Sequence, residues 1–166
     1  VHDALSAWLG HEVRLSPPPA DGVWPMEMHT GMEDDTTPLF DWPGPEGTWL
    51  DLADAHLLTT RSLRSISATH DGDFDVRRFR PTALVEATAD DEWPEDAWGQ
   101  LCVGAVECEV LMPTPRCTMP SRAQPGLERD TAIGKAIRDH HDNNLGVYAT
   151  VTRAGTIRVG DPVRSR

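Results

Sequence analysis

The chain has 166 residues and a mass of 18.3 kDa, enough for one globular domain with a hydrophobic core. Hydrophobic residues make up 39% and charged residues 25%, which excludes a disordered chain, and a formal net charge of −12 excludes general binding to nucleic acids or anionic membranes. No apolar run reaches the roughly 18 residues of a membrane span, and three cysteines are too few for a disulfide framework, so we expect a cytoplasmic protein.

The N-terminal part predicts a short helix, a strand and a long loop. Residues 3–10 predict a helix that Asp3 caps and that ends at Gly10, because glycine readily adopts a left-handed conformation. Residues 11–15 predict a strand. Residues 17–47 are rich in proline, glycine, aspartate and glutamate, which predicts an acidic, solvated loop, with a lid over a site as the alternative.

The first regular elements of the central part are short. Residues 55–59 predict a strand, and residues 60–68 a helix that begins with a hydroxyl cap at Thr59 or Thr60. Residues 83–87 predict another strand.

Two strand pairs follow from the alternation of apolar residues. Residues 101–103 and 105–112 predict a pair of strands, with a bend or bulge at Gly104 between them. Residues 145–152 and 156–159 predict a hairpin, because Arg, Ala and Gly between them form a turn sequence.

The clearest helix lies between these pairs. Residues 130–141 predict a helix with Asp130 as its cap and an apolar face that includes His140. His140, His141 and Asp142 resemble a metal-binding cluster, but histidines also favour the C-terminal end of a helix, which is the interpretation we prefer. In total we predict six or seven short strands and two or three short helices without regular alternation, hence a mainly β fold: a barrel or a curved sheet with helical insertions.

Cys117 is the first candidate for chemistry. It follows a strong predicted strand, and the prolines at 113 and 115 stiffen the exit from that strand. A neighbouring guanidinium, here Arg116, favours the thiolate, which is the form of cysteine that attacks, carries sulfur or binds soft metals. An inert loop cysteine is the alternative. Cys102 and Cys108 lie within apolar strands and are predicted to be buried, and no zinc-site spacing is present.

Three arginines form a dense basic group within residues 75–81. Arg77, Arg78 and Arg80 carry planar, forked donors that suit a phosphate or a carboxylate. The alternative is that they pair with the neighbouring acidic residues Asp71, Asp73 and Asp75.

The order of these segments resembles the MOSC domain, the module named for the C-terminal part of molybdenum cofactor sulfurase. The matching segments are LLTTRSL at 57–63, DVRRFRP at 75–81, LCVG at 101–104, PRC at 115–117, LGVY at 145–148 and GTIRVGDPV at 155–163. The resemblance implies a β-barrel of the kind also found in pyruvate kinase. It implies one domain over 1–166, and a further N-terminal β region upstream, of which only the tail is expected here.

The resemblance also implies a set of site residues. Cys117 would bind molybdenum or carry sulfur as a persulfide. The residues that would contact a molybdenum-pterin cofactor are Arg80, Thr82, Arg116, Tyr148, Thr59, Ser62 and Arg78. Thr82 stands where many relatives have asparagine, so that a side-chain amide contact is lost or replaced.

Two functions follow from the resemblance. The first is an oxidoreductase that reduces N-hydroxylated small molecules and receives electrons from a separate reductase, since the sequence has no flavin, haem or iron–sulfur signature. The second is a sulfur carrier that accepts a persulfide from a cysteine desulfurase. Pyridoxal phosphate is not expected, because nothing around Lys135, the only lysine, suggests a site for it.

Overall fold

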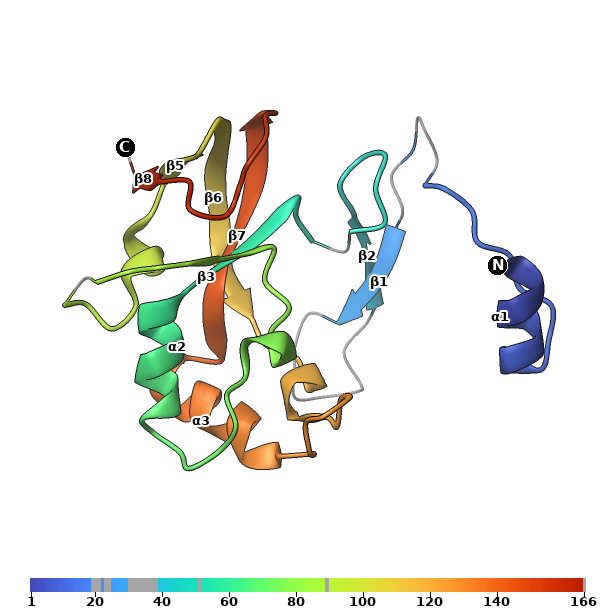
Figure 1. The fold of residues 1–166 in the computed structure, drawn as a ribbon, viewed down its shortest axis with the longest axis horizontal. Coiled ribbons are helices and arrows are strands. Elements are labelled where there is room, and N and C mark those ends of the chain that lie inside the picture. The colour runs from blue at the N-terminus through green and yellow to red at the C-terminus, as the bar shows by residue number, and fades with distance from the viewer. Residues whose placement is uncertain (19–21, 23–24, 30–38, 51, 89, 166) are drawn as a thin grey trace. The chain divides into compact units, whose positions relative to one another are not determined.

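The computed structural model divides into two compact units, Val1–Leu52 and Ala53–Arg166, which are described separately (Figure 1). The residues that it describes are 1–18, 22, 25–29, 39–50, 52–88 and 90–165. Among them, no helix is both long and apolar enough to cross a membrane.

The first unit begins with helix α1 (His2–Leu9), which buries none of its residues. As predicted, α1 ends at Gly10, whose φ of 76° is left-handed. The cap residue is Val1, however, and the predicted Asp3 cap is wrong. The strand predicted over 11–15 is also absent, because the backbone of this segment bonds to the helix: the Val13 N–H donates to Ser6 Oγ at 2.9 Å.

Two strands occupy part of the segment for which we predicted an irregular acidic loop. Strand β1 (Pro25–His29) pairs antiparallel with β2 (Leu39–Pro43), in a register that joins Pro25 to Pro43. The apolar residues Met26 and Trp42 face each other across this ribbon. Cross-strand pairing of this kind depends on a distant partner, which the proline-rich composition concealed.

The second unit is built on a six-stranded mixed sheet in the order β4-β3-β7-β6-β5-β8. Its strands are β3 (Ala55–Thr59), β4 (Ala83–Val85), β5 (Gln100–Val103), β6 (Val106–Pro115), β7 (Asn144–Arg153) and β8 (Val163–Ser165). Only β3 and β4 are parallel. Register shifts between the two longest strands, β6 and β7, curl the sheet into a half-barrel (Figure 1). The mainly β prediction is confirmed. The closed barrel is not, since β4 and β8 end the sheet without pairing to each other in the part of the chain described.

Helices α2 (Thr60–Ser67) and α3 (Thr131–His141) follow the local signals in the sequence. The Thr59 side chain accepts the Ser62 N–H at the start of α2, and Asp130 accepts the Ala132 N–H at the start of α3, as predicted. His140, placed on the inward face by its spacing, is exposed. The buried positions of α3 are therefore Ile133, Ala136 and Ile137 only.

Strand β3 separates two hydrophobic clusters, because successive side chains of a strand point to opposite faces. Leu58 packs with α2 and α3 in the first cluster, which includes Ile66, Ile133 and Ile137. Leu57 packs on the other side with residues of β5, β6 and β7. Strand β3 is thereby held between two packed layers.

The C-terminal segment departs from the predicted hairpin. Strand β7 extends to Arg153, but residues 156–159 belong to no strand, and the chain pairs again only as β8, beside β5. Gly104 explains this route. Its φ is 56°, as expected for a bend, and its N–H donates to Pro162 O at 3.1 Å. A side chain at Gly104 would lie 2.5 Å from the Asp161 carboxylate, so glycine allows the C-terminal segment to approach.

Candidate functional site

Cys117 lies two residues beyond the end of β6 and is exposed. The other two cysteines lie within the sheet: Cys102 is half-buried on β5, less buried than predicted, and Cys108 is buried on β6. Burial raises the pKa of the Cys108 thiol, and the nearby Asp54 carboxylate adds to this shift. Of the three thiols, Cys117 is the one that solvent reaches freely.

Arg116, directly before Cys117, is anchored through both its backbone and its side chain. Its N–H donates to Asn143 O at 2.8 Å, and the Asn143 side-chain amide donates back to Arg116 O at 3.0 Å. Its guanidinium donates from Nη2 to Phe79 O at 3.0 Å and lies 5.5 Å from the centre of the Phe79 ring. The thiol is therefore carried by a segment whose preceding residue is fixed.

Phe79 also connects this segment to Arg80. Arg80 is exposed and has a φ of 52°, a left-handed conformation that is rare for residues other than glycine. It follows the 3-10 helix η1 (Val76–Arg78), and its N–H donates to Val76 O at 3.3 Å. Because Arg116 bonds to Phe79 O, the segments that carry Cys117 and Arg80 are tied together one residue before each of them.

His56 on β3, which was not predicted as a site residue, contacts three residues that were. Its N–H donates to Thr82 Oγ1 at 3.0 Å, and Thr82 N–H donates to His56 O at 2.7 Å. Its ring atom Nε2 lies 3.4 Å from Nη1 of Arg116, and the ring centre lies 5.6 Å from that of Tyr148. His56 carries no site signal in the sequence, because a lone histidine in an apolar strand is typical of a core position.

Arg78 does not face this site. Its side chain is only 2% exposed. Its guanidinium donates to four backbone carbonyl oxygens, those of Asp73, Pro120, Arg122 and Glu128, at 2.7, 3.1, 3.3 and 2.8 Å. These acceptors lie before η1 and around the 3-10 helix η3 (Met119–Ser121), so Arg78 joins two loops.

Arg77 supports the alternative interpretation of the basic group. It forms an ion pair of 2.7 Å with Asp75. Hydrogen bonds from the Arg77 side chain and backbone lower the pKa of Asp75 to about 2. Of the three arginines, Arg80 alone is both exposed and adjacent to the anchored Phe79.

Thr59 and Ser62 lie around a buried carboxylate. Glu95, in the 3-10 helix η2 (Pro94–Ala97), is fully buried. Its Oε2 accepts from Thr59 Oγ1 at 2.7 Å and from Ser62 Oγ at 2.6 Å. Both hydroxyls are fully buried, so this network joins η2 to the start of α2.

The residues at the end of α3 also form structural contacts. His141 donates from Nε2 to Asp96 at 2.7 Å, and its ring stacks on Trp93 with the centres 4.0 Å apart. A cluster of three metal-ligating side chains is absent from the part of the chain that the structure describes. Lys135 is exposed and pairs with Asp139 one turn away.

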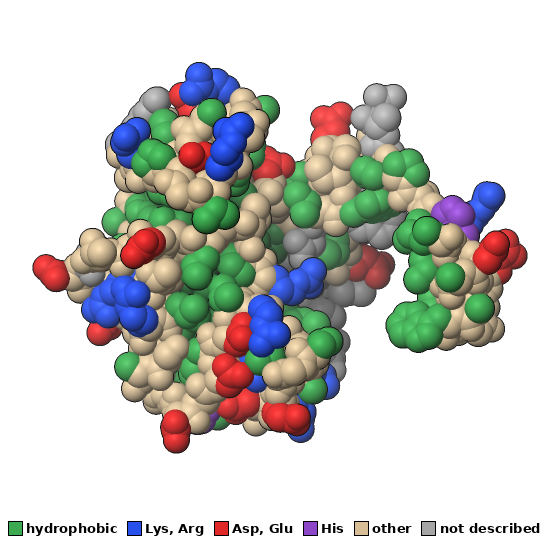
Figure 2. Space-filling view, viewed as in Figure 1, with side chains coloured by type: hydrophobic (Ala, Val, Ile, Leu, Met, Phe, Trp, Pro, Cys, Tyr) green, Lys and Arg blue, Asp and Glu red, His purple; other side chains and the backbone are tan. Residues whose placement is uncertain are grey.

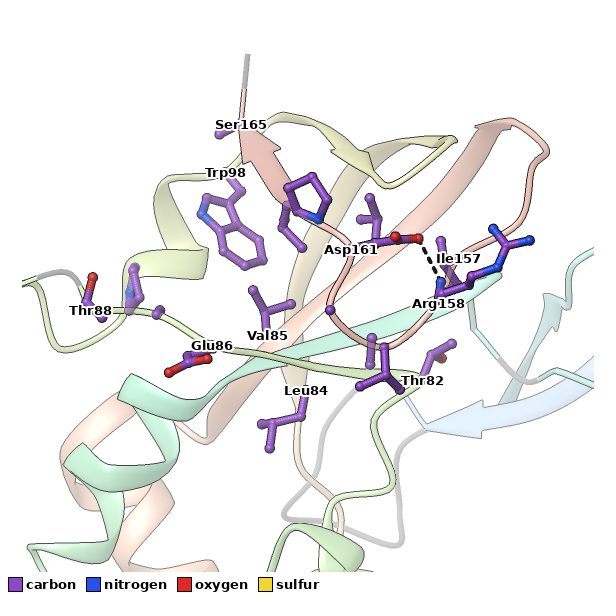
Figure 3. Close-up of a pocket in the computed structure, with 18 residues that line it drawn as sticks. Thr82, Leu84, Val85, Glu86, Thr88, Trp98, Ile157, Arg158, Asp161 and Ser165 are labelled. Atoms are coloured by element: carbon purple, nitrogen blue, oxygen red, sulfur yellow. Dashed lines mark hydrogen bonds between the residues drawn. The ribbon is translucent and has the colours of Figure 1, made fainter.

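A cavity of about 930 Å³ opens between β4, η2 and the C-terminal segment (Figure 3). Val85, Trp98 and Ile157 form apolar parts of its wall, and the Asp161 carboxylate accepts the Arg158 N–H at 2.7 Å on its rim. Figure 2 shows hydrophobic side chains gathered on the visible face of the second unit, between basic and acidic ones. Thr82 is the one predicted site residue that lines this cavity.

Comparisons with known proteins identify one domain family and one group of similar proteins. The family model described as the MOSC domain matches residues 50–164. The chain is 30% identical over 123 residues to mitochondrial amidoxime reducing component 2 of Homo sapiens, covering 64% of this chain and 35% of the relative. It is 25% identical over 170 residues to mitochondrial amidoxime-reducing component 1 of Danio rerio, covering 97% and 51%. The chain thus spans a third to a half of the length of these relatives.

Proposed function

Because this chain belongs to the MOSC domain family, we propose that its second unit binds a molybdenum-pterin cofactor and takes part in the reduction of N-hydroxylated small molecules. The names of its relatives, amidoxime reducing components, support this class of substrate. The alternative, a persulfide carrier, gains no support from these relatives.

The chemistry of the donor set fits such a cofactor. Molybdenum accepts thiolate sulfur as a ligand, and Cys117 offers an exposed thiol on an anchored segment. A pterin cofactor is anionic, and the guanidinium of Arg80 is exposed on the segment tied to that of Cys117. Thr82 and Tyr148 contact the same histidine as Arg116 does.

Three predicted residues fall outside the proposed set. Thr59 and Ser62 are fully buried and direct their hydroxyl groups at Glu95. Arg78 directs its guanidinium at backbone carbonyl oxygens. We therefore keep Cys117, Arg80, Thr82, Arg116 and Tyr148 in the proposed site.

Each of these residues has a distinct task in the proposal. When bound, the cofactor supplies electron transfer at its metal. Cys117 holds the metal through its thiolate, and Arg80 binds the anionic part of the cofactor through its forked donors. Arg116 orients the segment that carries Cys117, while Thr82 and Tyr148 line the site. The electrons come from a separate reductase, since the sequence contains no second redox signature.

The proposal depends on one observation: Cys117, the exposed one of the three cysteines, lies on a segment tied to that of Arg80. Metal analysis of the full chain, produced in cells that make the cofactor, tests it. We expect molybdenum to co-purify with the wild type and with Cys102→Ser, and to be lost in Cys117→Ser. Equal molybdenum in both cysteine variants, or none in the wild type, would contradict the proposal.

The role of Arg80 is tested in the same preparation. Arg80→Ala is expected to weaken cofactor retention by about 1–3 kcal/mol, the contribution of a charge-assisted hydrogen bond. Arg77→Ala is the matched control, because Arg77 is paired with Asp75 on the surface. If both variants retain the cofactor equally, Arg80 does not contact it.

A further inference from the structure

His56 is a polar side chain in a strand whose five residues are all buried. It is 8% exposed, and the large majority of buried side-chain polar atoms have a hydrogen-bond partner. The strand on either side of it is not polar, since Ala55 and Leu57 both belong to the hydrophobic cluster around β5 and β6. The partners of His56 therefore show what this side chain contributes.

The backbone of β7 leaves room for the imidazole. Gly146 has a φ of 84°, and a side chain there would lie 2.5 Å from Nε2 of His56 and 2.6 Å from Leu57 O. A residue larger than glycine would displace the ring. Glycine at this position keeps Nε2 within reach of two groups: Leu145 O at 3.3 Å and Nη1 of Arg116 at 3.4 Å.

The two groups require opposite roles of Nε2: a donor towards Leu145 O and an acceptor towards Arg116. Leu145 O accepts hydrogen bonds, whereas the guanidinium of Arg116 only donates them and keeps its protons. The Arg116 contact is a hydrogen bond when the ring carries its proton on Nδ1 and offers the lone pair of Nε2. We infer that His56, in this tautomer, is a positioning residue: it accepts a hydrogen bond from Arg116 and thereby fixes the loop that carries Cys117.

The inference rests on the proposed function of Cys117 and adds a residue to it. Without His56, Arg116 would keep its backbone bonds to Asn143 and its contacts with Phe79, so the loop would remain in place but gain freedom. His56 also exchanges two hydrogen bonds with Thr82 through its backbone, and a side-chain substitution leaves these unchanged. The effect of the imidazole is thus separable from that of the strand.

A spin label on Cys117 measures this freedom directly, in a full chain that carries Cys102→Ser and Cys108→Ala. We expect His56→Phe, which keeps the ring contact with Tyr148 but lacks Nε2, to increase the mobile fraction of the label about fivefold, the effect of losing one hydrogen bond. His56→Gln should restore the wild-type spectrum, because its amide oxygen can accept from Arg116. Arg116→Met should mobilise the label at least as much as His56→Phe does, because it also removes the contacts with Phe79. The double variant should not exceed Arg116→Met.

Controls separate this result from loss of folding and from the proposed function. A label on Cys102, in a chain with Cys117→Ser and Cys108→Ala, should not respond to His56→Phe. If His56→Phe fails to fold, His56→Asn replaces it, since the shorter amide cannot reach Arg116. An unchanged Cys117 spectrum, additive effects in the double variant, or no rescue by His56→Gln would overturn the inference. Molybdenum content is measured separately. A chain whose Cys117 label is held by the bond between Arg116 and His56, but which binds no metal, therefore contradicts only the proposed function.

Discussion

Replacing Arg78 with methionine tests whether this buried guanidinium is a structural connection rather than a ligand-binding group. The side chain is 2% exposed. Methionine has a similar length but no donors, so the substitution removes four hydrogen bonds at once. The carbonyl oxygens of the two loops would then lose their shared partner.

The magnitude follows from the surroundings of the acceptors. A hydrogen bond from a charged donor contributes about 1.5–3 kcal/mol, so four would contribute about 6–12 kcal/mol if all were lost without replacement. Only the bond to Pro120 O is fully buried, however, and the other three acceptors can bind water once Arg78 is gone. We therefore expect a loss of about 3–5 kcal/mol in the free energy of unfolding, a large part of the total for a domain of this size.

Urea unfolding, followed by far-UV circular dichroism, measures this loss. Arg77→Met is the matched control, because Arg77 is the exposed neighbour and makes only a surface ion pair. Arg78→Lys keeps the positive charge but lacks the planar, forked donors of the guanidinium. It should recover only part of the unfolding free energy that Arg78→Met loses. The reasoning fails if Arg78→Met and Arg77→Met unfold at the same urea concentration.

Three further outcomes are expected. Iodoacetamide should alkylate Cys117 faster than Cys108 in the folded chain, because burial hides Cys108 and raises its pKa; equal rates would contradict this. Asp130→Asn should lower the melting temperature at neutral pH. Burial alone would raise the pKa of Asp130, but hydrogen bonds from His70 and the α3 backbone outweigh it and lower that pKa. The difference should therefore begin to shrink once the pH falls below about 4, and disappear when the pH lies below the lowered pKa and the wild-type carboxylate is protonated. Thr114→Val should raise the unfolding free energy by about 1 kcal/mol, because the Thr114 hydroxyl is fully buried and has no hydrogen-bond partner among the described residues; a decrease would indicate a bound water or ligand there.

The sequence predicts best the elements whose signals are local. The strand over 55–59 has the predicted bounds, and the caps Thr59 and Asp130 were identified because a hydroxyl or carboxylate before an apolar periodic run is specific for a helix start. Gly104 is likewise predictable as a bend, because a glycine between two apolar strand segments marks a bend or a bulge. Each of these features depends on residues within one turn of itself.

The failures concern pairing between distant segments. The predicted partner of β7 was the segment just after it, whereas its actual partners are β3 and β6. The ribbon of β1 and β2 was concealed in the same way. Local alternation of apolar residues identifies a strand, but the choice of partner depends on the whole sheet.

The same distinction applies to the candidate site. The exposure of Cys117 agrees with its position after a proline-stiffened strand end. The importance of His56 was not apparent, because its relation to Arg116, Thr82 and Gly146 exists only after three separate parts of the chain have come together.

The pairing of β3 with β7 also bears on how the chain is made. His56 and Leu145, which contact each other across this pair, are 89 positions apart. Closing so long a loop is entropically costly and slow, and it cannot begin during synthesis until β7 has left the ribosome. Until then β3 lacks the neighbour on one of its two sides. A nascent chain that stalls before residue 144 would leave this edge of β3 unpaired and would expose part of Leu57 to chaperones and proteases, because the cluster around Leu57 includes Val147 and Ala149 of β7.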